Sequence, residues 1–394
     1  MDTVTQIIPS KYKQTEIGMI PTDWDVKKLG DVAPLQRGFD LPTSQLKTGS
    51  FPVVYSNGIS NFHNKAMAKA PGVVTGRSGT IGKVNYIEED YWPHNTTLWV
   101  TNFKGNDEKY IYYLYSYLKI ERFSTGSGVP TLNRNDVHEF EVAIPKLKSE
   151  QSAVATALSN SDSLITKLEK LIQKKKNIKQ GVMQELLTGK RRLHGFNSEW
   201  QKVKLGELFS LSATYSKIKF LDEGGSFLIM DMGSVSSEGK MIALKRTSSP
   251  VDLLKTGDLV MPKDDIGGGN IIGKVAYIDR DNRYVLSDHV YKLIVKTPEI
   301  NTLFFSYLIN SNAVSTKLKK KVAGSAQLGL GKKSVEDQDV DYPKDRDEQI
   351  AIATVLYEMN IEIEKLESQL TKYQNIKQGM MQTLLTGKIR LLTK

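Results

Sequence analysis

The sequence predicts an α+β protein in which two mixed α/β modules are separated by two long helices that form an antiparallel coiled coil. Three observations predict this class: a long segment occurs twice, both copies space apolar residues in heptads, and the remaining sequence alternates short β-like runs with turn residues. The repetition also predicts a pseudo-twofold relation between the halves of the chain. The expected boundaries are 1–145 and 194–342 for the modules, and 146–193 and 343–394 for the helical segments.

The duplicated segment is the strongest internal signal. Residues 145–193 and 343–391 share 27 identities in 49 positions without a gap. Both copies open with Pro-Lys followed by Glu-Gln, and both close with Leu-Leu-Thr-Gly-Lys. Weaker matches lie upstream, including an Ile-Gly-Lys-Val run at 81–84 and 272–275 and the pair Trp24 and Trp200. Each module is therefore expected to be one copy of a diverged repeat, with longer loops in the second.

Each copy of the duplicated segment predicts one long helix. In the second copy the apolar residues follow alternating steps of four and three, which is the spacing of a helix packed along one seam. The first copy has the matching positions, but Ser161 and Lys175 interrupt its apolar stripe. A helix of about 38 residues is roughly 57 Å long and cannot bury such a stripe alone, so we expect the two copies to pack on each other. Two unrelated bundle helices are the alternative. The predicted seam consists of Val154, Leu158, Ile165, Leu168, Ile172, Ile352, Leu356, Met359, Ile363, Leu366, Leu370 and Tyr373.

The two modules contain the signals of mixed α/β structure. Strands are expected at Phe51–Tyr55, 82–87 and 284–295, and helices at 108–118 and 301–309. Tyrosines crowd the first of these helices, and helix-to-sheet packing is a better explanation for them than base stacking.

Composition excludes several classes of protein. The chain has no cysteine, which excludes disulfides and thiolate metal sites, and its five histidines are scattered. No apolar run approaches the ~20 residues that cross a bilayer, and the N-terminus does not resemble a secretory signal. We therefore expect a cytoplasmic protein with no membrane partner. The net charge is +10 and falls mostly on 144–193, which could face DNA, an acidic partner or only solvent.

Signals of catalysis are weak or incomplete. The run Gly268–Lys274 has the spacing of a phosphate-binding loop, but Val275 follows where a Ser or Thr must hold magnesium. The Asn-Pro-Pro-aromatic signature of adenine methylation is absent, as is a Gly-x-Gly-x-x-Gly run. His94-Asn95 lacks the further ligand of a metal site. We expect no catalytic residue, no metal and no cofactor bound by this chain.

The sequence strongly resembles the DNA-specificity subunit of type I restriction-modification systems. The resemblance rests on the two predicted helices, each of which starts near Glu-Gln and ends with the motif Asn-Ile-Lys-Gln-Gly-x-Met-Gln-x-Leu-Leu-Thr-Gly-Lys. The resemblance implies that each module is a target recognition domain for one half of a bipartite, asymmetric double-stranded DNA site. It also implies that the helices set the gap and dock two adenine-N6 methyltransferase subunits, and that restriction (translocase) subunits join them. S-adenosylmethionine, ATP and Mg would then be bound by those partner subunits.

Groove readout needs Arg or Lys for guanine and Asn or Gln for adenine, on a background of phosphate contacts. Loop residues of these kinds are the DNA-binding candidates. In the first module they are Arg37, Asn57, Asn61, His63, Lys65, Arg77, Ser78, Lys83, Ser127, Asn133 and Arg134. In the second they are Tyr215, Lys217, Lys219, Lys263, Lys274, Lys320, Ser325, Gln327, Lys332 and Lys333.

Other functions stay open at this point. The nearest rival is the specificity subunit of a related bipartite-site system, in which one partner polypeptide both methylates and cleaves. A coiled-coil adaptor without DNA binding belongs to a different class, and an NTP-dependent enzyme would depend on Gly268–Lys274 alone.

Overall fold

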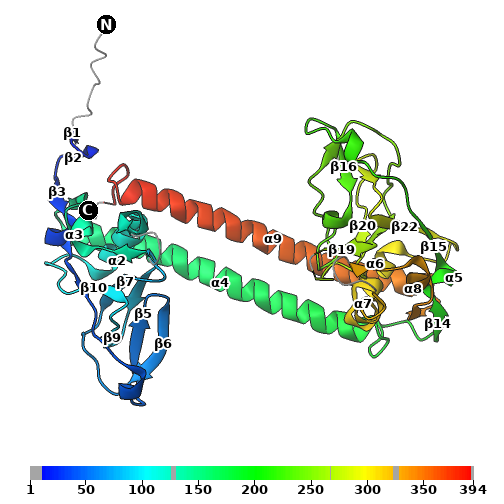
Figure 1. Ribbon diagram of the computed structural model, residues 1–394, viewed down its shortest axis with the longest axis horizontal. Coiled ribbons are helices and arrows are strands. Elements are labelled where there is room, and N and C mark those ends of the chain that lie inside the picture. Colours follow the sequence, from blue (N-terminus) through cyan, green and yellow to red (C-terminus); the bar gives the residue numbers. More distant parts are fainter. Residues whose placement is uncertain (1–10, 126–129, 267, 323–327, 392–394) are drawn as a thin grey trace, which may run out of the picture. The chain divides into compact units, whose positions relative to one another are not determined.

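The computed structural model describes residues 11–125, 130–266, 268–322 and 328–391, and the chain divides into two compact units. The first unit contains residues 1–170 and 368–394, and the second contains 171–367. Each unit holds one mixed α/β module and part of both long helices, α4 (Lys148–Leu186) and α9 (Arg346–Leu384), which Figure 1 shows as continuous ribbons. Among the described residues, no helix is long and apolar enough to span a membrane.

The first module is built on a four-stranded antiparallel sheet in the order β4-β10-β7-β8. A second sheet has the order β6-β5-β9, and β9 leads directly into β10. The strands of these two sheets are β4 (Leu35–Arg37), β5 (Phe51–Tyr55), β6 (Gly58–His63), β7 (Gly72–Gly76), β8 (Val84–Ile87), β9 (Trp92–Pro93) and β10 (Thr97–Val100). The expected strand Phe51–Tyr55 is present as predicted, and the one expected at 82–87 begins at Val84.

Helix α2 (Glu108–Tyr117) covers this sheet. Asp107 caps its first turn, where the side chain accepts the N–H of Tyr110 at 2.8 Å. The tyrosine-rich face belongs to the core, because Tyr110, Tyr113 and Tyr115 are all at most 1% exposed. The shorter elements of the module are β1 (Tyr12–Thr15), β2 (Gly18–Pro21), β3 (Trp24–Lys28), α1 (Leu29–Val32), η1 (Thr43–Gln45), η2 (Ile120–Phe123), β11 (Ser124–Thr125), β12 (Thr131–Leu132), α3 (Arg134–His138) and β13 (Glu141–Pro145).

The second module repeats this plan. Its main sheet has the order β15-β22-β18-β20, and a second sheet has the order β17-β16-β21. The strands are β14 (Trp200–Lys204), β15 (Phe209–Ser212), β16 (Phe227–Met230), β17 (Arg246–Thr247), β18 (Leu259–Pro262), β19 (Asp264–Asp265), β20 (Ala276–Tyr277), β21 (Tyr284–Leu286), β22 (Val290–Val295), β23 (Leu328–Gly329) and β24 (Asp339–Pro343). The helices are α5 (Leu205–Leu208), η3 (Ile218–Phe220), η4 (Met232–Ser234), α6 (Thr302–Asn310), α7 (Asn312–Lys319) and α8 (Lys332–Glu336). The single strand expected at 284–295 is two strands, because the chain turns at 287–289 between the two sheets.

The strand registers relate the two modules residue by residue. Val54 of β5 pairs with Pro93, and Met230 of β16 pairs with Leu286 in the same parallel arrangement. In the main sheets, Leu35 of β4 pairs with Val100 of β10, and Leu211 of β15 pairs with Leu293 of β22, so these two strand pairs are also equivalent in the two modules. Positions therefore correspond with an offset of 176 up to the end of β5, and with an offset of 193 in β9 and β10.

Within the first unit, the start of α4 lies beside the end of α9. Glu150 in the first turn of α4 forms an ion pair with Arg390, which follows α9. Asp162, three turns further along α4, pairs with Lys377 at 2.6 Å. Since the partner number falls as the α4 number rises, the two helical segments run in opposite directions.

Within the second unit, the end of α4 lies beside the start of α9 in the same way. Arg192 pairs with Glu348, and Lys175 pairs with Glu362 at 2.6 Å. The residues of the predicted seam are buried at Val154, Leu158, Leu168, Ile172, Ile352, Leu356 and Ile363. They are partly buried at Ile165, Met359, Leu366, Leu370 and Tyr373.

The Gln of each Glu-Gln motif ties its helix to a module. The side-chain oxygen of Gln151 accepts the N–H of Asp107 at 2.8 Å, and that of Gln349 accepts the N–H of Asn301 at 2.9 Å. Each amide nitrogen also donates to the carbonyl of the proline that ends the preceding strand. Asp107 and Asn301 are the N-caps of α2 and α6, so the repeated motif fixes the same helix start in both modules.

Candidate nucleic-acid interface

Several loops of the first module meet at one end of its main sheet. We call this region the first sheet end; it comprises residues 37–40, 55–61, 76–80 and 93–97. Backbone hydrogen bonds hold it together: Thr96 O accepts from the N–H groups of Arg77 and Ser78, and His94 N donates to Val54 O. Segments up to 40 positions apart in the sequence are thereby held together at this end of the sheet.

Three polar side chains make a connected group at the first sheet end. One carboxylate oxygen of Asp40 accepts from Arg37 Nη2 at 2.9 Å, and the same oxygen accepts from the Asn95 side-chain amide. The hydrogen bond from Asn95 and the charge of Arg37 lower the pKa of Asp40 below its usual value. The carboxylate therefore remains an ionised acceptor between two donors.

A second group lies next to it. Asn61 donates to the Tyr55 hydroxyl at 3.1 Å, and the Tyr55 ring lies 4.3 Å from the His94 ring. Burial lowers the pKa of His94, so the ring is neutral at pH 7. These groups offer both donors and acceptors, as base edges require.

The structure places most first-module candidates at or near this end. Lys83 donates to Asn57 O at 2.7 Å, while Lys65 and Arg134 are exposed. Asn133 is exposed but caps α3, since its side chain accepts the N–H of Asn135. Ser127 lies outside the described residues.

The expectation for His63 is wrong. Its side chain is buried, Nδ1 lies 3.0 Å from the Lys47 backbone nitrogen, and its ring meets the Trp92 ring edge-on. His63 therefore holds the 47–51 loop to β6 and has no free edge for a base. Strand alternation would not have indicated this, because the two buried ends of β6, Gly58 and His63, are five residues apart and would be expected on opposite faces.

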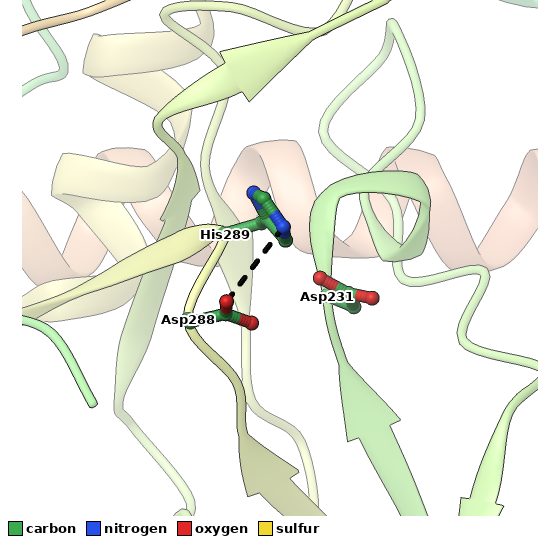
Figure 2. A group of neighbouring side chains, drawn as sticks. All are labelled: Asp231, Asp288 and His289. Carbon is green, nitrogen blue, oxygen red and sulfur yellow. Dashed lines mark ion pairs between the residues drawn. The ribbon is translucent and has the colours of Figure 1, made fainter. Parts of the chain in front are cut away.

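The corresponding second sheet end comprises residues 212–217, 231–234, 262–265 and 287–290. Figure 2 shows Asp231, Asp288 and His289 converging there, with one ligand atom of each within 4.8 Å of the others. Two of them are already engaged elsewhere: Asp231 with Lys245 at 2.9 Å, and His289 with Asp264 at 2.9 Å. The three residues therefore belong to a polar network whose members already have partners within the module.

Lys217 is also a wrong expectation. It is 1% exposed, and its ammonium contacts Asp252 at 2.6 Å and lies 3.6 Å from the Tyr215 ring centroid. Tyr215 and Lys219, on either side in sequence, are exposed. The alternation of exposed and buried residues in this loop cannot be read from composition, because all of these residues are polar or aromatic.

The expectation that Lys274 contacts DNA is also wrong. Burial lowers its pKa, and its ammonium donates to Asn310 O at 2.9 Å and to Ser315 Oγ at 3.1 Å. The lysine of the apparent phosphate loop is thus partly buried and held against α6 and α7. A Cβ at Gly273 would lie 2.9 Å from Leu318 Cβ, so that glycine serves helix packing.

The remaining second-module candidates are at or near the surface. Lys263 is partly buried at the second sheet end, and Lys320, Lys332 and Lys333 are exposed. Ser325 and Gln327 lie outside the described residues.

Sequence motifs alone do not reveal Asp40, Tyr55, His94 and Asn95 as members of this surface. His94 and Asn95 stand out in the sequence only as possible metal ligands, and Asp40 carries no motif. The repeat of the strands could have identified them. When β9 and β10 are aligned with β21 and β22, the residues between the two strands differ in sequence between the modules although the strands themselves are equivalent.

Comparison with known proteins identifies the family. The model of the type I restriction modification DNA specificity domain matches residues 21–180 and 197–372. The chain belongs to this family. The two matched stretches each cover one module and the first part of the helix that follows it, so the resemblance stated from the motifs is confirmed.

Named relatives agree. The chain is 27% identical over 310 residues to the type I restriction enzyme MjaVIII specificity subunit of Methanocaldococcus jannaschii, covering 72% of this chain and 71% of the relative. It is 24% identical, with 97% of each chain covered, to a putative type I restriction enzyme specificity subunit, MjaX, of the same organism. The crystal structure of a type I restriction-modification S subunit from M. genitalium has the same fold, with a TM-score of 0.67, 17% identity and coverage of 97% of this chain and 99% of that one.

The chain is thus a DNA-sequence-specificity subunit of the type I class, and this class of subunit is noncatalytic.

Proposed function

We propose that this specificity subunit reads a bipartite, asymmetric DNA site. The first module, at 1–145, would read one half through the first sheet end, and the second, at 194–342, the other half through the second sheet end. The observation that carries this proposal is the shared strand register of the two modules combined with different side chains at the two sheet ends. A common frame with divergent polar tips is what two readers of different sequences require.

The helical segments would act as the ruler between the half-sites. We propose that 146–193 and 343–394 form an antiparallel coiled coil with a pseudo-twofold axis, since the same ion pair and the same Gln contacts occur at both module-helix junctions. Such a spacer would also dock two adenine-N6 methyltransferase subunits, and restriction subunits would join that complex. S-adenosylmethionine, ATP and Mg would be held by those partners, in the cytoplasm.

The test is selection from randomised DNA duplexes by this chain in complex with its methyltransferase partner. We expect enrichment of a two-part motif with a fixed gap. Replacing 196–341 with the module of another family member should change one part only. Enrichment of a single uninterrupted motif, or of none, would contradict bipartite reading, and the second result would favour an adaptor.

The rival with a fused methyltransferase-nuclease partner predicts the same DNA site but a different complex. Purification from the native cell should give separate methylating and restriction polypeptides. A single polypeptide with both activities would favour the rival. Mapping methylated adenines across the genome with and without this gene would identify the site in either case.

A further inference from the structure

Arg37, Asp40 and Asn95, which we call the Arg37 cluster, are held in fixed positions by the backbone. Arg37 ends β4 and Asn95 precedes β10, and the two segments are joined by Gly38 N to Thr97 O at 3.0 Å and Phe39 N to Pro93 O at 2.8 Å. The sheet therefore positions the cluster before any ligand arrives, which reduces the entropy lost on binding.

The side chains of the Arg37 cluster are fixed in position but still have exposed hydrogen-bonding groups. The side chains of Arg37 and Asp40 are 49% and 64% exposed. A guanidinium has five N–H donors in a planar fork, and the hydrogen bond to Asp40 uses only Nη2. The remaining donors can form two parallel hydrogen bonds to a planar ligand with adjacent acceptors.

The chemistry fits the major-groove edge of guanine. Its O6 and N7 are two adjacent acceptors, and a bidentate Arg is the commonest specific contact to them. A phosphate could also accept from Arg37. However, Arg37 is oriented by a carboxylate and interacts electrostatically with His94, whose ring lies against Tyr55, and these neighbours are groups suited to base edges.

The second module supports a role in specificity. Through the strand registers, the positions of Arg37, Asp40 and Asn95 correspond to Ala213, Ser216 and Asp288. One framework contact beside these positions occurs in both modules, because His94 N donates to Val54 O and Ser287 N donates to Met230 O. Arg, Asp and Asn occur together at these three positions only in the first module. A contact needed only for folding would have no reason to differ at this point, whereas readers of two different half-sites must differ.

Given the function proposed above, we propose that Arg37 reads a guanine in the half-site of the first module, and that Asp40 is the positioning residue that orients its guanidinium. Asn95 completes the site by donating to the same Asp40 oxygen, and its side-chain carbonyl oxygen can accept from a neighbouring amino group.

The experiment is selection from duplexes randomised in both half-sites, with the complete methyltransferase complex at several salt concentrations. Arg37→Lys keeps the charge and loses the fork. We expect it to reduce the guanine preference at one position of one half-site by about 10- to 100-fold, with an unchanged salt slope and an unchanged second half-site. Asp40→Ala should weaken the same preference, and Asp40→Asn, which retains an acceptor oxygen, should restore part of it.

Lys104→Ala is the matched control. It removes one exposed charge beyond the opposite end of β10 and should leave the motif unchanged. An unchanged motif for Arg37→Lys would overturn the inference, and so would an equal loss of affinity for all sequences in Arg37→Ala, which indicates a phosphate contact. Loss of methyltransferase binding without DNA in Arg37→Lys would indicate a protein contact and would also overturn it. If the wild-type complex selects no two-part motif, the proposed function itself fails, whatever Arg37 does.

Discussion

Arg390 binds Glu150 through two nitrogens, at 2.8 and 2.6 Å, although the residues are 240 positions apart. Arg192 and Glu348 make the same paired contact in the second unit, at 2.5 Å for each bond. The carboxylates are 3% and 0% exposed, so each arginine neutralises a charge that has almost no access to water. In both units, therefore, the arginine that follows one long helix neutralises the buried glutamate in the first turn of the other long helix.

Removing one of these arginines should destabilise its unit. We expect Arg192→Ala to lower the free energy of unfolding by about 3–5 kcal/mol, because Glu348 would be left buried without a partner. The neighbouring Arg191 pairs with Glu185, and both are about half exposed, so Arg191→Ala should cost no more than about 1 kcal/mol. Urea unfolding of the purified variants measures both, and equal losses would show that the buried pair has no special role.

Asp252 and Lys217 should respond unequally to mutation. Asp252→Ala would leave the buried ammonium of Lys217 without its carboxylate, at a cost of about 3 kcal/mol. Lys217→Met should cost less, because Asp252 is 35% exposed and also accepts from Thr214. The double variant should recover most of the loss, and urea denaturation of all three variants is the measurement.

The pH dependence of this pair has a defined sign. Burial alone would raise the pKa of Asp252, but hydrogen bonds from Lys217 and Thr214 hold it below its usual value. The stabilisation is therefore present above the ordinary carboxyl pKa of about 3.9 and is lost as the pH falls through the lowered value. Acid denaturation of the double variant should lack this component; an unchanged acid midpoint would contradict it.

An asymmetry between the units predicts a stabilising substitution. In the first unit, Asp162 accepts from the Tyr113 hydroxyl at 2.7 Å and pairs with Lys377. The repeat places Asn360 and Lys179 at the equivalent positions, and burial lowers the pKa of Lys179. We expect Asn360→Asp to supply the missing carboxylate and to stabilise the second unit by about 1 kcal/mol. Asp162→Asn should destabilise the first unit.

Because the pKa of Lys179 is lowered in the folded protein, keeping this lysine charged on folding costs free energy. Lys179 therefore reduces the free energy of unfolding at any pH where it is charged in the unfolded chain. That penalty should be relieved as the pH rises through the lowered value toward the ordinary lysine pKa of about 10.4. Lys179→Met should remove this rise, and Asn360→Asp should reduce it. Thermal unfolding across the alkaline range tests both, and identical curves for wild type and Lys179→Met would reject the explanation.

Two glycines of the duplicated segment should respond in opposite ways. Gly379 lies inside α9, and a Cβ at this position would have open space around it, so Gly379→Ala should stabilise by about 0.5–1 kcal/mol. Gly387 has a φ of 71°, and a Cβ there would lie 2.6 Å from Pro21, so Gly387→Ala should destabilise. Urea denaturation distinguishes the two, and stabilisation by both would contradict the packing at Gly387.

The duplication made the frame predictable. Periodicity and repetition involve many residues at once, so they can be recognised in the sequence alone. The apolar spacing between Val154 and Leu384 predicted two long helices, which the structure shows to have 39 residues each, and the repeat predicted two related modules. The first-module strand at 51–55 and the helix from Glu108 were predictable from local composition: the strand is a short β-like run, and the helix is a run rich in Tyr and Leu.

The sheet ends were less predictable, because they depend on which loops meet. Lys217 and Lys219 look alike in the sequence, yet one is bound to Asp252 in the interior and the other is exposed. Asp40 gains its significance only because Asn95 is brought beside it by the pairing of β4 with β10. Tertiary contacts of this kind leave no local pattern.

The division of the chain into units has a consequence for synthesis on the ribosome. Residues 171–367 of the second unit are continuous, and they can complete their core as soon as they emerge. The core of the first unit includes Leu384 and Leu385, which are translated after the whole of the second unit. The unit whose module is translated first is therefore completed after the other, and a chain broken off between residues 367 and 384 would retain the second unit while the core of the first lacks Leu384 and Leu385.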